Sequence, residues 1–241
     1  MVFFLLIVEL VLLLFISRQV TQNINGFLFR VTKNGSAALS FITILLFPGT
    51  IIHELSHLFT AEILGVRTGK LTLVPEGIEG PSFAEASAGE AEIRAGSVAI
   101  ANTDPIRRTI IGVAPVFVGL LALMAISYFL PINWTHWSNW TNWKNLLLLY
   151  LLFAISNSMF SSREDMKGVI PVFLTLGLFA EATYVAGFRF SLTGQAEVFV
   201  VRALESLTKS LGLVLAVNGV ILLTVKVLLG VIGKIRSSVG R

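Results

Sequence analysis

The sequence contains no cysteine, only two aspartates and three histidines, and few charged residues of either sign. Without cysteine there are no disulfides and no thiolate ligands, so a bound zinc ion must be held by His, Asp, Glu and water. Charged residues make up 13% of the chain and hydrophobic residues 55%, a composition well outside that of soluble domains. The net charge of +4 suits anionic lipid headgroups, and no basic stripe with interleaved aromatics indicates a nucleic-acid site.

Long apolar runs predict a polytopic membrane protein of the all-α class, with residues 1–241 forming a single integral membrane domain. Residues 1–17 carry Glu9 and lack both a positively charged start and a small-residue cleavage pattern. We therefore expect a retained span there rather than a removed signal peptide. At about 20 residues per crossing, six spans are predicted, at residues 2–17, 37–64, 108–130, 145–160, 168–188 and 211–233.

One long polar connection, residues 66–107, separates the second span from the third. Alternating apolar residues predict two short strands within it, one at 70–75 that contains Leu73 and one at 92–101 that contains Ile93. A Gly/Ser/Ala/Glu-rich stretch links the two strands. The alternative is an ordinary solvated loop.

Other segments point to the membrane–water boundary. Tryptophans recur at every third position from Trp134 to Trp143, as is typical of an interfacial aromatic belt. Residues 195–208 are amphipathic, which favours a position along the membrane surface. If the amino terminus is cytoplasmic, ten Lys and Arg residues fall in inner segments and seven in outer ones. This bias puts the connection 66–107 on the cytoplasmic side.

A His-Glu-x-x-His motif, formed by His53, Glu54 and His57, lies within the apolar span 37–64. Residues four apart stack on one face of a helix, so the two imidazoles can close on one zinc ion. Glu54 lies beside them, where a carboxylate can take a proton from a zinc-activated water. Ionisable residues in hydrocarbon are costly unless they pair, bind metal or line a wet cavity. The alternative is that these are core residues satisfied by ordinary polar contacts.

Pro48 and Gly49 stand just before the motif. This pair predicts a kinked or loosened helix that frees backbone carbonyls next to the site. The alternative is an ordinary proline kink with no chemical role.

A catalytic zinc ion takes three protein ligands and keeps one open position, so a third residue must join the histidines. Asp165 is the favoured candidate. It follows the fourth predicted span, and the second and fourth spans both end on the cytoplasmic side. Asp165 can therefore approach the zinc from a neighbouring helix. The alternative for this residue is a solvated charge paired with Arg163 or Lys167.

Three other carboxylates remain candidates for the third ligand. Glu76 and Glu79 lie about 20 residues past the motif, at a separation that some zinc peptidases use for a glutamate ligand. Asp104 directly precedes Pro105, a pattern typical of a turn at the start of the third span. A third histidine six residues beyond the motif is excluded, because Ile63 occupies that position.

Two elements of the sequence resemble the site-2 protease family of intramembrane zinc metalloproteases. The first is His53-Glu54-Leu55-Ser56-His57 within an early span. The second is the run from Asn157 to Asp165, which keeps the spacing of the family's Asn-x-x-Pro motif and the Asp-Gly that follows it. Here Phe160 replaces the proline and Met166 the glycine. The motifs cover about 15 residues, and the order of spans extends the likeness over a catalytic core at residues 37–168.

The resemblance implies hydrolysis of peptide bonds in transmembrane protein substrates, with Zn²⁺ as cofactor and Glu54 as general base. It also implies that Asn157 helps to position the substrate. A helical substrate must unwind before attack, and an exposed strand edge near Leu73 or Ile93 can hold it extended by strand addition. That edge resembles the membrane-associated β element of the family.

Two alternatives come from other classes of protein. One is a non-enzymatic zinc-binding membrane transporter or receptor, because intramembrane His and Asp residues also line ion pathways. Glu54 argues against it, since a transport site has no need for a general base beside the ligands. The other is a membrane zinc peptidase of a different family, with Glu76 or Glu79 as third ligand.

Overall fold

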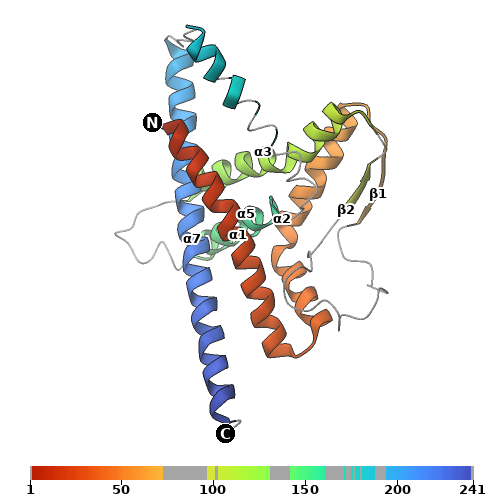
Figure 1. Cartoon of the computed structure of the whole chain (residues 1–241), viewed down its shortest axis with the longest axis vertical. Helices are drawn as coiled ribbons and strands as arrows, with labels where there is room; N and C mark the ends of the chain where they lie inside the picture. Colours follow the sequence, from red (N-terminus) through yellow and green to blue (C-terminus); the bar gives the residue numbers. More distant parts are fainter. Residues whose placement is uncertain are drawn as a thin grey trace.

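The computed structural model describes residues 2–72, 97–100, 103–130, 142–160 and 194–239, together with a few short pieces between 171 and 187. These residues form five long helices and two short strands, in the order α1, α2, β1, β2, α3, α5 and α7 (Figure 1).

The chain begins with a helical hairpin, α1 (Val2–Thr32) and α2 (Gly35–Ile63). The turn between them uses Lys33 at a φ of 55°, a left-handed conformation that ends a helix. Asn34 then caps α2, because its side-chain oxygen accepts hydrogen bonds from the backbone N–H groups of Ser36 and Ala37. This tight connection makes α2 run back along the molecule, against the direction of α1.

Local signals also set the starts of the next helices. Pro105 occupies the first turn of α3 (Pro105–Phe129), and Asp104 caps it through the N–H of Arg107. Asn142 caps α5 (Trp143–Ser158). The last helix, α7 (Gln195–Val239), continues for 45 residues.

A two-stranded antiparallel sheet lies within the polar connection 66–107. It pairs β1 (Thr68–Thr72) with β2 (Ser97–Ile100), and Leu71 stands opposite Val98. Both strands contact α2, beside which they lie in Figure 1. The predicted strands at 70–75 and 92–101 overlap these segments, whereas Leu73 and Ile93 themselves lie outside the described residues.

Four of the described helices are long and apolar enough to cross a membrane: α1, α2, α3 and α7. At 1.5 Å per residue, the 16 residues of α5 measure about 24 Å, which is less than the roughly 30 Å of a hydrocarbon core. Of the predicted span at 168–188, the structure describes only separate pieces, which include helical residues at 177–179 and 181–185.

Two helices are longer than the predicted spans. Helix α1 continues past residue 17 to Thr32, and α7 joins the predicted surface segment 195–208 to the span 211–233. Neither range contains a proline. A helix that has already formed propagates through polar residues at little cost, so polarity alone does not end it.

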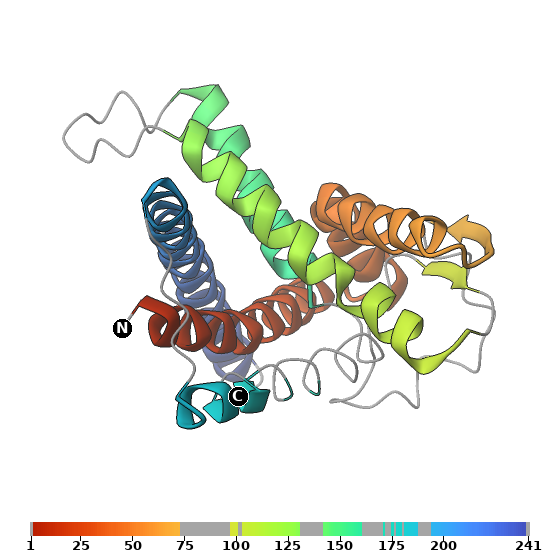
Figure 2. The same ribbon diagram turned by 90° about the horizontal axis from the view of Figure 1, so that it is seen from above.

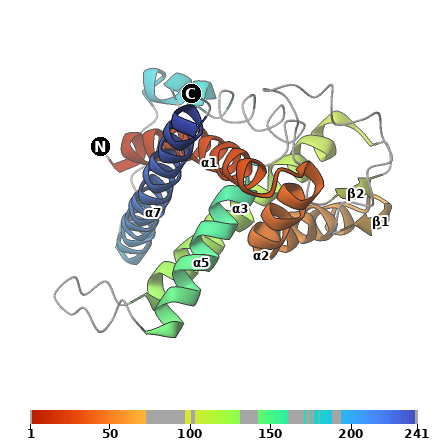
Figure 3. The same ribbon diagram turned by 90° about the horizontal axis from the view of Figure 1, so that it is seen from below.

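The helices pack as two connected groups. In one, α1 lies against α7; in the other, α2, α3 and α5 pack against one another. Figures 2 and 3, from above and below, show α3 and α5 side by side, with α2 next to them. A buried cluster that includes Leu13, Leu123, Leu152 and Leu211 joins the two groups. The motif-bearing helix α2 therefore has neighbours on several sides.

Candidate metal centre

The imidazoles of His53 and His57 converge on the inner face of α2. Their Nε2 atoms are 3.3 Å apart, and the rings meet edge to face with centroids separated by 4.9 Å. The two nitrogens are also within hydrogen-bonding distance of each other. The helical i, i+4 spacing brings the two nitrogens together, as the sequence predicted.

A backbone carbonyl of α3 determines which nitrogen of His57 carries a proton. His57 Nδ1 lies 2.9 Å from the carbonyl oxygen of Ile111. A carbonyl oxygen can only accept, so Nδ1 must be the donor. In the neutral ring the lone pair is then on Nε2, the nitrogen that faces His53. This arrangement leaves His57 ready to bind a metal through Nε2.

All three ionisable residues of the motif are buried. The exposed fractions are 4% for His53, 6% for Glu54 and 6% for His57. Burial of such groups is costly unless hydrogen bonds or opposite charges compensate it. In a helix of membrane-spanning length, buried ionisable residues such as these are the first candidates for a functional site.

Helix α5 approaches α2 one turn before His53. A Cβ placed on Gly49 would lie 2.6 Å from the carbonyl carbon of Ala154 and closer still to its oxygen. Only glycine permits such an approach of two backbones. Next to this contact the Ser158 hydroxyl donates to the Leu46 carbonyl over 3.4 Å. Pro48 lies inside α2, which continues through it as a single helix. Gly49 is the point at which α2 contacts α5.

A second polar cluster joins α5 to α7. Asn157 Nδ2 donates to Asn218 Oδ1 and to the Phe153 carbonyl, both at 2.7 Å. Asn218 Nδ2 donates in turn to the Ser156 hydroxyl over 3.0 Å. All three polar side chains are buried. The Asn157 Oδ1 atom has no hydrogen-bond partner among the residues that the structure describes.

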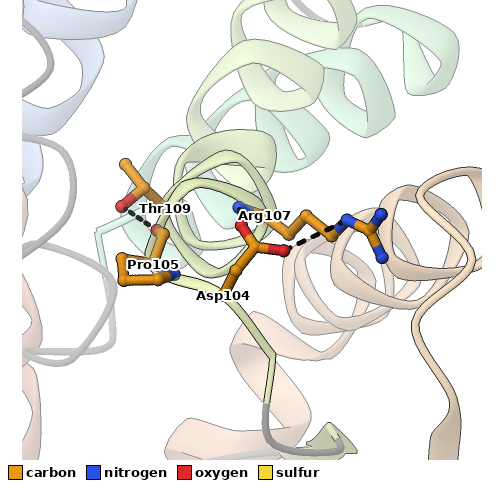
Figure 4. Close-up of polar contacts among 4 residues, drawn as sticks. All are labelled: Asp104, Pro105, Arg107 and Thr109. Atoms are coloured by element: carbon orange, nitrogen blue, oxygen red, sulfur yellow. Dashed lines mark hydrogen bonds and ion pairs between the residues drawn. The ribbon is translucent and has the colours of Figure 1, made fainter.

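Asp104, one of the alternative third ligands, has a different role in the structure. Its carboxylate accepts from the N–H of Arg107 and forms an ion pair with the Arg107 Nε at 3.2 Å, while the Thr109 hydroxyl donates to the Pro105 carbonyl (Figure 4). Asp104 is 48% exposed at the start of α3. It is the helix cap that the turn pattern predicted.

The remaining third-ligand candidates, Asp165, Glu76 and Glu79, lie outside the described residues. Within the described part of the chain, no group of three His, Cys, Asp or Glu side chains that could hold a metal ion is found. The structure therefore contributes two converging histidines and a neighbouring glutamate to the centre.

Sequence reasoning missed two groups near this site. It named neither the Ile111 carbonyl nor Asn218, because each reaches its partner across a distance in sequence, 54 residues in the first case and 61 in the second. Asn218 is a polar residue in a predicted span, and that signal could have marked it for attention.

In comparisons with known proteins, no family model, no curated protein and no solved structure matches this chain.

Proposed function

We propose that this chain is an intramembrane zinc metalloprotease, with His53 and His57 as ligands and Glu54 as general base. The observation that carries the proposal is the geometry of the two Nε2 atoms. With Zn–N bonds of about 2.0–2.1 Å and a tetrahedral angle, two ligand nitrogens stand about 3.3–3.4 Å apart. The two Nε2 atoms in this structure are 3.3 Å apart, which matches the nitrogen–nitrogen distance expected for two ligands of one zinc ion.

The donor set supports zinc in particular. Imidazole nitrogens and a carboxylate, with no thiolate, are the ligands of many catalytic zinc sites. A metal-binding histidine commonly donates its other N–H to a carbonyl or carboxylate, which holds the ring in place. The bond from His57 Nδ1 to the Ile111 carbonyl is of this kind.

Asp165 remains the proposed third ligand on grounds of reach. The end of α5 is tied to α2 at Leu46, and seven residues of helix, about 10 Å, separate Leu46 from His53. Five residues separate Phe160 from Asp165, which in extended form span about 17 Å. A connection of this length suffices to bring the carboxylate to the histidines. The alternatives Glu76 and Glu79 follow β1 in the sequence. Either one can act as a ligand only if the connection 66–107 folds back and brings its carboxylate to the histidines.

A zinc ion held by His53, His57 and a third ligand would supply Lewis-acid activation of the scissile carbonyl and of the attacking water. Glu54 takes the proton of the attacking water and passes it to the leaving amine. His57 keeps its orientation through the Ile111 carbonyl. We assign the Asn157 Oδ1, which is buried and without a partner among the described residues, as an acceptor for a substrate backbone N–H, since its Nδ2 is already engaged by Asn218.

The setting of the site follows from the same proposal. The chain crosses the membrane six times, the centre lies towards the cytoplasmic side, and the β1–β2 sheet is a membrane-associated element that adds an unwound substrate as a further strand. The substrates are transmembrane proteins. Contact of both strands with α2 supports this role, because it brings the sheet beside the helix that carries the proposed ligands.

Replacement of Glu54 by glutamine tests the proposal, because the amide keeps the shape of the carboxylate and removes the base. We expect Glu54→Gln protein to bind zinc as wild type does and to lose a factor of about 10²–10⁴ in cleavage of a membrane-embedded reporter. Metal content of the purified protein and cleavage in the same liposomes are the two measurements.

The matched control is Glu62→Gln, near the end of the same helix on an exposed position. It should leave both zinc content and cleavage unchanged. Cleavage by Glu54→Gln at the wild-type rate would rule out Glu54 as the general base. A wild-type protein that binds zinc but cleaves no reporter would favour a zinc-binding transporter instead.

A further inference from the structure

The carbonyl that accepts from His57 belongs to the residue four before a proline. In an α-helix, the carbonyl of residue 111 normally accepts from the N–H of residue 115. Residue 115 is proline, inside α3. Proline has no N–H, and its ring pushes away the carbonyl four residues earlier. The Ile111 carbonyl therefore lacks its helical donor and is available to a donor from outside the helix.

The surroundings make that acceptor costly to leave open. The Ile111 side chain is 1% exposed and packs with Ala61 and Val66, at the end of the motif helix. Pro115 is among the most deeply buried residues of the molecule. A buried carbonyl without a donor is strongly destabilising. The His57 Nδ1–H, at 2.9 Å, is the donor that satisfies it.

We propose that Pro115 is a positioning residue for the metal centre. By withholding its own N–H, it reserves the Ile111 carbonyl for His57. The ring of His57 is thereby held as the Nδ1–H tautomer, with the lone pair of Nε2 directed toward His53 before any metal arrives. The consequence for zinc rests on the proposed function, whereas the tautomer of His57 does not.

Replacement of Pro115 by alanine restores the missing N–H. The new donor competes with His57 for the Ile111 carbonyl and draws that carbonyl back toward the axis of α3. His57 then loses part of its orientation and populates the Nε2–H tautomer. Loss of the hydrogen-bond partner of a metal-binding histidine typically costs 10–100-fold in metal affinity, so we expect zinc to bind about tenfold more weakly.

The experiment has two readouts on full-length protein in detergent micelles or nanodiscs. The first is the ¹⁵N chemical shift of the His57 ring nitrogens in zinc-free protein, assigned by comparison with His57→Gln. The second is zinc affinity by competition with a chelator. Val113→Ala is the control: Val113 is also buried in α3, and its truncation removes two methyl groups without adding a donor. It should change neither readout.

Folding stability separates a positioning role from a merely structural one. Alanine is a far better helix former than proline, so Pro115→Ala should not reduce the melting temperature although it weakens zinc binding. If the space left by the ring prevents folding, Pro115→Val restores the same N–H with more of the volume retained.

Three outcomes would overturn the proposal: an Nε2–H tautomer of His57 in zinc-free wild-type protein, an unchanged tautomer in a folded Pro115 variant, or equal losses of zinc affinity in Pro115→Ala and Val113→Ala. A protein that binds no zinc but has the Nδ1–H tautomer, lost in Pro115→Ala, would contradict the proposed function and leave the role of Pro115 in place.

Discussion

Gly49 of α2 and Ala154 of α5 touch backbone to backbone, so that a Cβ on Gly49 would lie 2.6 Å from the Ala154 carbonyl carbon. Real Cβ atoms essentially never approach another heavy atom this closely. The contact lies one helical turn before His53. It therefore sets the distance between the helix that carries the histidines and the helix that leads to Asp165.

Substitution of Gly49 by alanine should separate these two helices. Overpacking a well-packed contact typically costs about 1–3 kcal/mol, and we expect the upper end, because the obstacle is backbone rather than a flexible side chain. Unfolding of the protein in mixed micelles measures the stability. Zinc affinity should fall with it, since α5 no longer holds its place beside α2.

Gly230→Ala is the matched control for this prediction. Gly230 lies in α7, where a new Cβ meets nothing within 4 Å among the described residues. Alanine there should be neutral or stabilise the helix by up to about 1 kcal/mol. Equal effects of the two substitutions would mean that the α2–α5 contact is not a constraint on the fold.

The third ligand can be identified by metal analysis. We expect purified wild-type protein to hold one zinc ion per chain and Asp165→Ala to lose most of its zinc affinity, because two histidines alone form an incomplete site. Asp104→Ala is the control, since the structure assigns Asp104 to the cap of α3. Wild-type occupancy and affinity in Asp165→Ala would transfer the assignment to Glu76 or Glu79.

Strand addition to the polar connection 66–107 can be tested with proline. A proline cannot donate to a neighbouring strand, so Leu73→Pro or Ile93→Pro should impair cleavage of a helical transmembrane reporter more than cleavage of a short unstructured peptide. Alanine at the same positions should have a milder effect. Both positions need testing, because Leu73 follows β1 and Ile93 precedes β2 in the sequence, and only one of the two strands can be the free edge.

The ratio of the two cleavage rates is the decisive quantity. If neither proline changes that ratio in folded, zinc-loaded protein, this connection does not present substrate, and unwinding takes place elsewhere.

The amide pair Asn157–Asn218 should couple α5 to α7 energetically. Interhelical hydrogen bonds in membrane proteins contribute about 0.6 kcal/mol on average and up to about 1.7. A double-mutant cycle with Asn157→Ala and Asn218→Ala should give a coupling within this range, because the bond is buried and 2.7 Å long. Additive effects would show that the Asn157–Asn218 hydrogen bond does not couple the two helices.

Asn218→Ala also tests the role of Asn157 in substrate handling. With Asn218 removed, the Asn157 amide can rotate and its Oδ1 is no longer held open. Cleavage should then fall more than zinc affinity, since neither asparagine is a proposed ligand. Parallel losses of zinc and cleavage would instead assign the pair to the metal centre itself.

Several features of this protein follow from local sequence. The apolar runs predicted helices of membrane-spanning length, and four of the described helices have that length and composition. The i, i+4 spacing of His53 and His57 predicted that their rings meet, and the position of Asp104 before Pro105 predicted a turn. The last two predictions depend only on residues within one or two turns of helix, where backbone geometry is almost invariant, and the first depends on the composition of one continuous segment.

Helix ends were less predictable. The continuation of α1 to Thr32 and of α7 through residues 195–239 went against the polarity of those segments. Hydropathy indicates which part of a helix is stable in the hydrocarbon core of a membrane. The residue at which a helix ends depends instead on capping and helix-breaking residues. Lys33 with Asn34 supplies such a signal, and an amphipathic segment without proline does not.

The sequence by itself determined which functional groups are present: two histidines and a glutamate within about one helical turn, and no thiolates. It also determined that these ionisable groups lie in an apolar segment, where their burial costs free energy. Only the tertiary structure decided which partners these groups have. The Ile111 carbonyl beside His57, the backbone of Ala154 at Gly49, and Asn218 against Asn157 are each more than 50 residues from their partners. Such contacts depend on how helices dock, and docking depends on the fit of whole surfaces rather than on any local pattern.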